Sequence, residues 1–313
     1  MRILFLGSPA FAVPSLEALC NSTHEVVAVV TQPDRPKGRR LLLQPPAVKI
    51  AAHRLNLPVL QPATTKSDVF MQEVNSFHPD LLVVVAYGEI LRPALLDLPP
   101  RGAVNLHASL LPKYRGAAPI PWAILKGETI TGASTMMLNE VMDAGDVLLQ
   151  QECSIHPSDT TETLTKKLSH LGAPLLRKTV DLLEKNEVTP TPQDLKSVTY
   201  APKLRKQDGL IDWNKSASWI ARQIRAFDPW PGSFCFFRDF TIKLWLGHPA
   251  GWETIEKPGT IIDLTKQSLK VACGEGTVLE ILEIQPENRP RLTAADFIHG
   301  YNIHTHDHFL SAW

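Results

Sequence analysis

The sequence lacks the features that mark disulfide scaffolds, zinc sites and membrane spans. Its cysteines are scattered and form no Cys-x-x-Cys pair: Cys20, Cys153, Cys235 and Cys273. This spacing argues against a disulfide framework and favours a reducing compartment, the cytoplasm. No apolar run approaches the ~18 residues that a transmembrane helix needs. The opening MRILFLGSPAF is typical of a first β-strand rather than of a signal peptide.

Several common catalytic and cofactor motifs are also missing. The segment GSPAFA at 7–12 occupies the first expected strand-to-helix turn, but it lacks the later glycines of G-x-G-x-x-G. Without these glycines the backbone cannot come close to the pyrophosphate of a dinucleotide, which argues against a nicotinamide cofactor. The chain has no Walker loop, no H-E-x-x-H and no G-x-S-x-G elbow. Without a nucleophile of its own, it is expected to catalyse direct transfer to a nucleophile that a substrate supplies.

Charge of either sign is not in excess, because 32 basic residues balance 32 acidic ones. No overall field attracts nucleic acid, so such a partner needs a local patch. The segment 31–49, TQPDRPKGRRLLLQPPAVK, supplies one with a single acid among its basic residues: Arg35, Lys37, Arg39, Arg40 and Lys49. A solvated surface loop is the alternative. We favour nucleic-acid contact, since an exposed basic loop beside an α/β active site is suited to phosphates.

The pattern of the chain predicts two domains, as its 313 residues allow. Through residues 1–188, apolar runs typical of strands alternate with helical patterns, which predicts a doubly wound, mainly parallel α/β sheet. The expected strands are 3–7, 25–32, 80–88, 103–109, 132–138 and 146–155, and the expected helices are 13–20, 48–56 and 160–185.

The remainder of the chain has a different character. Residues 189–206 are rich in proline without a sustained period, which is typical of a linker. From residue 207 to 313, one helix near 217–227 precedes short strands separated by turns. This pattern predicts a C-terminal OB-like β-barrel domain.

The most informative segment is AVNLHASLLPKYRGAAPIPW, which begins at Ala103. Asn105 and His107 stand two residues apart in a strand, so their side chains project from the same face. The strand runs into an irregular loop, and strand ends of this kind are where α/β proteins bind ligands. A pair that only satisfies neighbouring backbone groups is the alternative. An amide beside an imidazole suits formyl or acyl transfer, and we favour that interpretation.

A carboxylate partner for His107 is expected from the turn NEVMDAGDVLL. Asp143 lies in this turn, and Asp146 follows three residues later. An Asp in such a turn is often only a turn former. It becomes catalytic if the fold brings it beside the imidazole, and the sequence does not separate the two candidates. An attacking α-amino group with a pKa of about 7.7–8.0 needs a polarised carbonyl and a route for its proton more than a strong base.

The C-terminal segment HGYNIHTHDHF contains four histidines: His299, His304, His306 and His308. Alternate histidines on a strand could bind a metal ion. Without a second carboxylate cluster, a polar surface is the better interpretation, and no metal is expected.

The chain closely resembles the bacterial methionyl-tRNA formyltransferases over nearly its whole length. The shared segments include LGSPAFAVPSLEAL, TQPDRPKGR, AYGEIL, NLHASLLPKYRGAAPI, MDAGDVL, YAPKLRKQDGLIDWNKSA and IRAFDPWPG. The N-terminal motifs alone are shared with other enzymes that use 10-formyltetrahydrofolate. The basic loop and the IDW to IRAFDPWPG region of the second domain make the resemblance specific.

The resemblance implies a Rossmann-like catalytic domain over 1–188, joined to an OB-like domain over 207–313 that helps to hold tRNA. It implies formyl transfer from 10-formyltetrahydrofolate to the amino group of methionyl initiator tRNA, by a cytoplasmic enzyme that we expect to be a monomer. It places the catalytic roles on Asn105, His107 and Asp143, which favours Asp143 over Asp146. It places folate contacts on Ser109, Leu110, Leu111, Pro112, Val85, Tyr87, Gly88 and Leu91. The tRNA-contacting loop arginine corresponds to Arg39, with Arg35, Lys37 and Arg40 beside it. The loop then departs from the family: many relatives continue it with glycine and two lysines, whereas here it continues with Arg40, Leu41, Leu42 and Leu43.

Three other functions are weighed against this expectation. A folate-dependent formyltransferase for a small amine, such as a glycinamide ribonucleotide or a sugar nucleotide, needs neither the basic loop nor the second domain. A non-catalytic RNA-binding protein on a degenerate enzyme scaffold does not need the intact Asn, His and Asp set. A nucleotide-dependent dehydrogenase is the most distant alternative.

Overall fold

The computed structural model describes residues 1–37 and 42–312, and the chain divides into two compact units. The first consists of Met1–Pro119, Ile130–Ser154 and Thr165–Pro202. The second consists of Ile120–Thr129, Ile155–Leu164 and Lys203–Trp313. No helix within the described ranges combines the length and the apolar character needed to cross a membrane.

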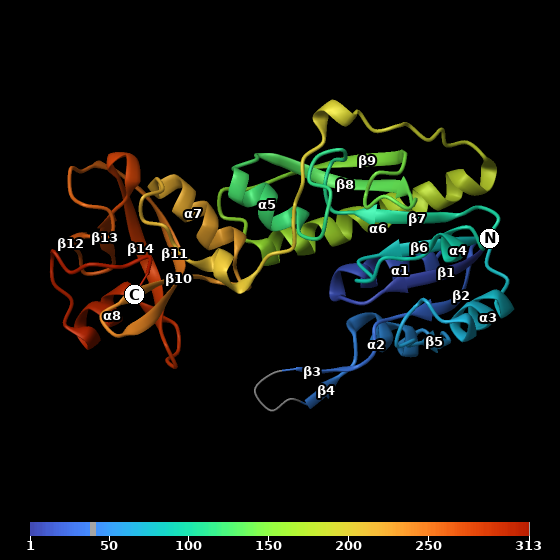
Figure 1. Ribbon diagram of the computed structural model, residues 1–313, viewed down its shortest axis with the longest axis horizontal. Helices are drawn as coiled ribbons and strands as arrows, with labels where there is room; N and C mark the ends of the chain where they lie inside the picture. The colour runs from blue at the N-terminus through green and yellow to red at the C-terminus, as the bar shows by residue number, and fades with distance from the viewer. Residues whose placement is uncertain (38–41, 313) are drawn as a thin grey trace. The chain divides into compact units, whose positions relative to one another are not determined.

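The described part of the first unit contains a seven-stranded sheet in the order β5-β2-β1-β6-β7-β8-β9, whose strands can be followed in Figure 1. Their bounds are Arg2–Gly7 (β1), Glu25–Val30 (β2), Val59–Leu60 (β5), Leu81–Val85 (β6), Ala103–His107 (β7), Ile130–Met137 (β8) and Val147–Ser154 (β9). The pairs from β5 to β7 are parallel, whereas β8 and β9 run antiparallel to their neighbours. The predicted Rossmann-like, mainly parallel sheet is confirmed.

The central strands are continuously apolar because both faces of the sheet are covered. On β1, Ile3 and Phe5 belong to one buried cluster, while Leu4 and Leu6 belong to another. Strand β6 divides its residues in the same alternating way. Successive strand side chains point to opposite faces, so a strand between two cores has no polar face.

The helices of the first unit are α1 (Val13–Cys20), α2 (Ala47–Arg54), α3 (Asp68–Ser76), α4 (Pro93–Leu96) and most of α6 (Thr161–Lys185). Pro14 lies in the first turn of α1, as expected. The sequence-based prediction omitted α3. Its signal was the N-cap Ser67, whose side chain accepts a hydrogen bond from the Phe70 backbone N–H.

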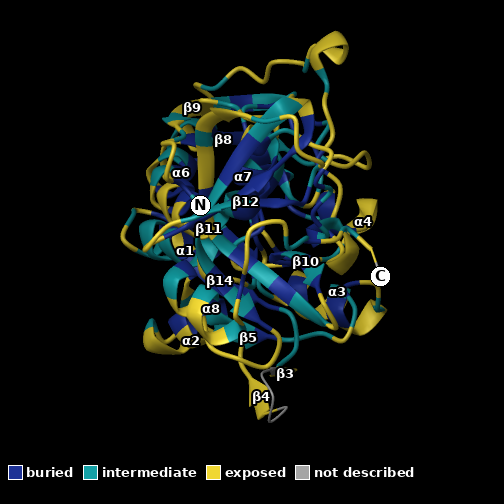
Figure 2. Ribbon diagram, turned by 90° about the vertical axis from the view of Figure 1, so that its left-hand side faces the viewer, coloured by how far each residue is buried: buried dark blue, intermediate teal, exposed yellow. Residues whose placement is uncertain are grey.

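The basic segment predicted as a loop contains a two-stranded antiparallel ribbon. Strands β3 (Arg35–Lys37) and β4 (Leu42–Gln44) pair with Arg35 opposite Gln44. The residues of β4 are exposed, as the yellow ribbon in Figure 2 shows. A strand without a buried face has no alternating apolar pattern, which explains why the sequence did not predict it.

The second unit is β-rich, as predicted. Its described strands form an antiparallel sheet in the order β10-β11-β14-β13-β12, with β15 paired to β14. The bounds are Ser233–Phe237 (β10), Phe240–Glu253 (β11), Ile261–Leu264 (β12), Leu269–Ala272 (β13), Thr277–Pro286 (β14) and Leu292–Thr293 (β15). Its described residues also include the helices α5 (Pro119–Lys126), most of which belongs to this unit, α7 (Ala217–Ala226) and α8 (Ala294–Tyr301). Closure of the sheet into an OB-like barrel stays a prediction.

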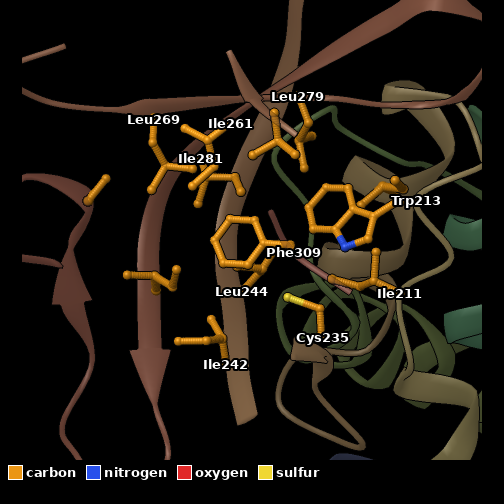
Figure 3. Packing of buried hydrophobic residues seen from close by; sticks show 14 of the residues in the cluster. Ile211, Trp213, Cys235, Ile242, Leu244, Ile261, Leu269, Leu279, Ile281 and Phe309 are labelled. Carbon is orange, nitrogen blue, oxygen red and sulfur yellow. The ribbon is translucent and has the colours of Figure 1, made fainter. Parts of the chain in front are cut away.

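The core of the second unit is built around stacked aromatic rings. Trp213 and Phe309 stack with their centroids 5.6 Å apart, and Phe237 contacts Phe309 at 5.2 Å. Figure 3 shows Trp213 and Phe309 among aliphatic residues of β11, β12, β13 and β14. Because this core is separate from the cores of the first unit, the second unit can hold its own fold.

Candidate active site

The two polar residues of β7 lie where this strand meets β8. His107 pairs with Ser134 and Asn105 pairs with Met136 across the antiparallel ladder. The imidazole of His107 is buried, with 6% of the residue exposed. Residues 105 and 107 share a face of β7 because they are two positions apart, as the sequence predicts.

Backbone geometry just after β7 fixes the ring of His107. Its Nε2 atom lies 2.9 Å from the carbonyl oxygen of Tyr114. A carbonyl oxygen only accepts, so Nε2 carries the hydrogen of this bond. Tyr114 has a φ of 60°, an uncommon conformation for a bulky residue. The loop therefore holds a locally unfavourable backbone beside the catalytic candidate, as functional sites often do.

The structure brings Asp143, rather than Asp146, to His107. The Nδ1 atom of His107 lies 3.7 Å from Oδ1 of Asp143. The other carboxylate oxygen, Oδ2, accepts a hydrogen bond of 2.8 Å from the Gly116 backbone N–H. The Asp146 carbonyl instead accepts from the Met137 backbone N–H, beside the start of β9. The turn thus provides one carboxylate at ion-pair distance from the imidazole.

Asp143 reaches this position because its loop folds back along the sheet. Strand β8 runs opposite to β7, so its last residue, Met137, lies beside Val104 and before His107. The loop then packs closely on the end of β8. A Cβ added to Gly145 would lie only 1.7 Å from the Met137 carbonyl oxygen. This close approach requires glycine at position 145.

Gly116 is held by the segment that the sequence predicts as a linker. Its φ is +122°, and an added Cβ would lie 2.6 Å from the Ala201 carbonyl oxygen. The neighbouring Arg115 backbone bonds with Thr199 and Ala201, and the Tyr114 N–H donates to the Thr199 hydroxyl. Hydrogen bonds to residues 199–201 therefore hold the loop 114–116 in place beside His107.

Gln193 of the same segment was missed by the sequence analysis. Its amide connects Arg115 to the backbone of the loop that carries Asp143. A glutamine in a proline-rich stretch gives no signal by itself, and only the fold places it beside the site.

The predicted folate residues Ser109, Leu110, Leu111 and Pro112 form a turn that is held by hydrogen bonds to its own backbone and to β8. The Ser109 hydroxyl donates to the Lys113 carbonyl at 2.6 Å. The Ser134 hydroxyl donates to the Ser109 carbonyl and accepts from the Leu111 N–H. Ser109 and Leu111 are buried, so their side chains shape the turn.

The other predicted folate residues lie at the end of β6 and in the loop after it. Val85, Tyr87 and Leu91 are buried in the two cores. Gly88 has a φ of +95°, and a Cβ built there would meet nothing within 4 Å. A ligand at this turn would therefore meet backbone at Gly88 rather than the buried side chains. Burial raises the pKa of the Tyr87 phenol to about 12, and the nearby Glu89 carboxylate acts in the same direction.

The basic patch is only partly described. Arg35 and Lys37 lie on β3, and the Arg35 guanidinium donates to the Gln32 side chain at 3.1 Å. Arg39 and Arg40 lie outside the described residues. Lys49 donates to both carboxylate oxygens of Asp34 at 3.0 and 2.9 Å. This interaction lowers the pKa of Asp34, and it pairs the charge of Lys49 with a carboxylate of the protein itself.

The C-terminal histidines do not form a shared site. Within the ranges that the structure describes, no three His, Cys, Asp or Glu side chains are grouped to hold a metal ion. His308 instead makes a 3.2 Å hydrogen-bond contact with the Thr260 hydroxyl.

Comparisons with known proteins show the family of the chain. Residues 1–180 match the formyl transferase family, and residues 203–302 match the formyl transferase C-terminal domain. The methionyl-tRNA formyltransferase of Citrifermentans bemidjiense is 45% identical over 97% of this chain and 94% of its own length. That of Thermodesulfovibrio yellowstonii is 47% identical over 96% of both chains.

Solved structures share the fold at low sequence identity. The sugar 3N-formyl transferase WlaRD superimposes with a TM-score of 0.68 at 18% identity, covering 93% of this chain and 99% of its own. HypX from Aquifex aeolicus, solved with tetrahydrofolic acid, gives a TM-score of 0.62 at 18% identity. The match covers 96% of this chain and 47% of HypX, so the chain spans about half of that protein.

The sheet and the two matched domains define a formyl transferase. The relatives that match over nearly the whole chain identify the group within this family. The chain belongs to the methionyl-tRNA formyltransferases within the formyl transferase family.

Proposed function

We propose that Asn105, His107 and Asp143 catalyse transfer of the formyl group of 10-formyltetrahydrofolate to the amino group of methionyl initiator tRNA. The observation that carries the proposal is the convergence of His107 and Asp143, whose facing atoms lie 3.7 Å apart. Asn105 stands on the same strand face as His107. Formyl transfer to an amine needs an oxyanion donor and a proton acceptor, and this set contains both.

The reaction needs no nucleophile from the protein. The lone pair of the amine attacks the formyl carbon, and the carbonyl electrons move to its oxygen. When this intermediate collapses, the bond between the formyl carbon and N10 breaks, and N10 takes the electron pair and a proton. The products are N-formylmethionyl-tRNA and tetrahydrofolate.

Each residue then has a role that follows from its position. The Asn105 amide donates to the formyl oxygen as negative charge develops there, a contribution worth roughly 10²–10³ in rate for one donor. Asp143 accepts the proton of the attacking amine through water. His107 completes the polar wall beside the oxyanion, and its ring direction is set by the Tyr114 carbonyl and by Asp143.

The substrates are assigned to separate parts of the first unit. The turns at Ser109–Pro112 and after Val85 hold the folate, with backbone groups near Gly88 available for its polar edge. Arg35, Lys37, Arg39 and Arg40 contact tRNA phosphates. We further propose that the enzyme acts as a cytoplasmic monomer.

One assay tests this function against its nearest rival. Purified protein is given labelled 10-formyltetrahydrofolate with charged initiator tRNA, with charged elongator methionine tRNA, or with a small amine. We expect efficient transfer only to the initiator species, with a rate at subsaturating tRNA that falls steeply with salt. Equal transfer to a small amine would instead favour the small-substrate formyltransferase. Full activity of Asn105→Ala would revive the non-catalytic RNA-binding hypothesis.

A further inference from the structure

Gln193 makes four hydrogen bonds that join the two loops of the site. Its Oε1 atom accepts from Nε and Nη2 of Arg115 at 3.0 and 2.8 Å. Its Nε2 atom donates to the carbonyl oxygens of Asp143 and Gly145 at 3.0 and 2.7 Å. Both donor hydrogens and the acceptor of the amide are therefore in use.

This arrangement allows only one orientation of the amide. A guanidinium donates and never accepts, so Oε1 must face Arg115 and Nε2 must face the two carbonyls. Arg115 is only 6% exposed, and it lies between Tyr114, which binds His107, and Gly116, which binds Asp143. One side chain thus connects the loop that orients the imidazole to the loop that carries the carboxylate.

The backbone around Gln193 is also anchored to the first unit. Thr191 exchanges two hydrogen bonds of 2.8 Å with Val147, at the edge strand β9. Thr199 and Ala201 bond to Arg115 further along the same segment. The backbone that carries the Gln193 side chain is therefore held in place on both sides of this residue.

We infer that Gln193 is a positioning residue for Asp143, an inference that rests on the catalytic role proposed above. It holds the backbone of residues 143–145 so that the carboxylate faces His107. It acts through Asp143 and contributes no group to the reacting atoms. Displacement of a catalytic group by about 1 Å can cost ~10²-fold in rate, so loss of these bonds should be visible in kcat.

Two substitutions test whether Gln193 positions Asp143 or only contributes to folding. Gln193→Glu keeps an acceptor for Arg115 but turns a carboxylate oxygen toward two carbonyl oxygens that need donors. Gln193→Met preserves the length of the side chain and removes all four bonds. We expect kcat to fall about 10- to 100-fold in both, with KM for each substrate within about threefold of wild type. Leu195→Ala, at a side chain 77% exposed on the same segment, is the control and should match wild type.

A double-mutant cycle tests whether Gln193 acts through Asp143. In an Asp143→Ala background, Gln193→Glu should cause no further loss of kcat, because the carboxylate that Gln193 positions is absent. Additive losses would overturn the inference. So would an unchanged kcat in a folded Gln193→Glu protein, or a defect confined to KM. Failure of the wild-type chain to formylate any acceptor would instead refute the proposed function, which keeps the two failures distinct.

Discussion

The imidazole of His107 is held by a backbone carbonyl: its Nε2 atom lies 2.9 Å from the oxygen of Tyr114. The ring direction therefore depends on the backbone conformation of the loop after β7, where Tyr114 has a φ of 60°. A histidine placed in this way has a defined donor hydrogen on Nε2 and presents Nδ1 toward Asp143.

Removal of the imidazole should lower the rate of the chemical step. We expect His107→Ala to reduce kcat by roughly 10²–10³, the range found for loss of one group that stabilises an oxyanion. The measurement is steady-state formylation of charged initiator tRNA, with KM determined for both substrates. His170→Ala, at an exposed position of α6, is the control. A kcat within threefold of wild type for His107→Ala would contradict the assignment.

The two aspartates of the turn offer a matched comparison. Asn at position 143 can still accept a hydrogen bond from Gly116 but cannot take up the proton of the amine. Asp143→Asn should therefore lose at least about 10² in kcat while the loop keeps its shape. Asp146→Asn should stay near wild type, because its carbonyl, not its carboxylate, bonds to Met137. An equal loss in both variants would indicate a structural role for the whole turn.

Gly116→Ala should destabilise the first unit. Its positive φ and the Ala201 oxygen at 2.6 Å from the added Cβ predict a cost of about 1–3 kcal/mol. Tryptophan fluorescence does not report on this unit, because the tryptophans of the described residues all lie in the second: Trp122, Trp213, Trp219, Trp230, Trp245 and Trp252. Urea unfolding followed by far-UV circular dichroism is the measurement. Gly300→Ala, where an added Cβ meets nothing within 4 Å, is the control and should cost far less.

The parts of the fold that were predictable are those with a local pattern. Strands β1 and β6 are apolar throughout because each lies between two cores, and α6 carries its leucines at helical spacing. The pair Asn105 and His107 was predictable for the same reason, since period-two alternation alone places both on one face.

The rest of the site depends on contacts between distant segments. The return of the Asp143 loop follows from the antiparallel direction of β8, which no local pattern encodes. Gln193 lies 50 residues from Asp143 in the chain, within a stretch whose prolines are typical of a linker. Its Thr191 neighbour pairs with β9, so a segment without periodicity is ordered by hydrogen bonds to the first unit.

The basic segment 31–49 should contribute to tRNA binding and not to the chemical step. Arg39→Ala should raise KM for tRNA about tenfold, consistent with loss of one phosphate contact, and leave KM for the folate unchanged. Because each phosphate contact releases counterions, the log–log slope of tRNA affinity against salt should decrease in magnitude by about one. Lys49→Ala should leave that slope unchanged, because Lys49 bonds to Asp34. A wild-type slope in Arg39→Ala would contradict the proposed contact.

Tyr87 should make the first unit sensitive to high pH. Tyr87 is 2% exposed, and its hydroxyl makes no hydrogen bond of good geometry within the described residues, although the nearby Gln32 side chain lowers its pKa to a lesser degree than burial raises it. Burial raises its pKa to about 12, against about 10 in an unfolded chain. Between these values the unfolded state binds fewer protons, so the free energy of unfolding falls as pH rises and is unaffected below pH 10.

Tyr87→Phe should remove this dependence. Because the buried hydroxyl gains little from the fold, the variant should be as stable as wild type or slightly more stable at pH 8. Between pH 9 and 11 its stability relative to wild type should rise by about 1 kcal/mol, measured by urea unfolding followed by circular dichroism. Tyr200→Phe, at a ring 73% exposed, is the control for loss of a phenol that folding does not bury. The same pH dependence in Tyr87→Phe and wild type would show that the phenol ionises as readily in the folded protein as in the unfolded chain.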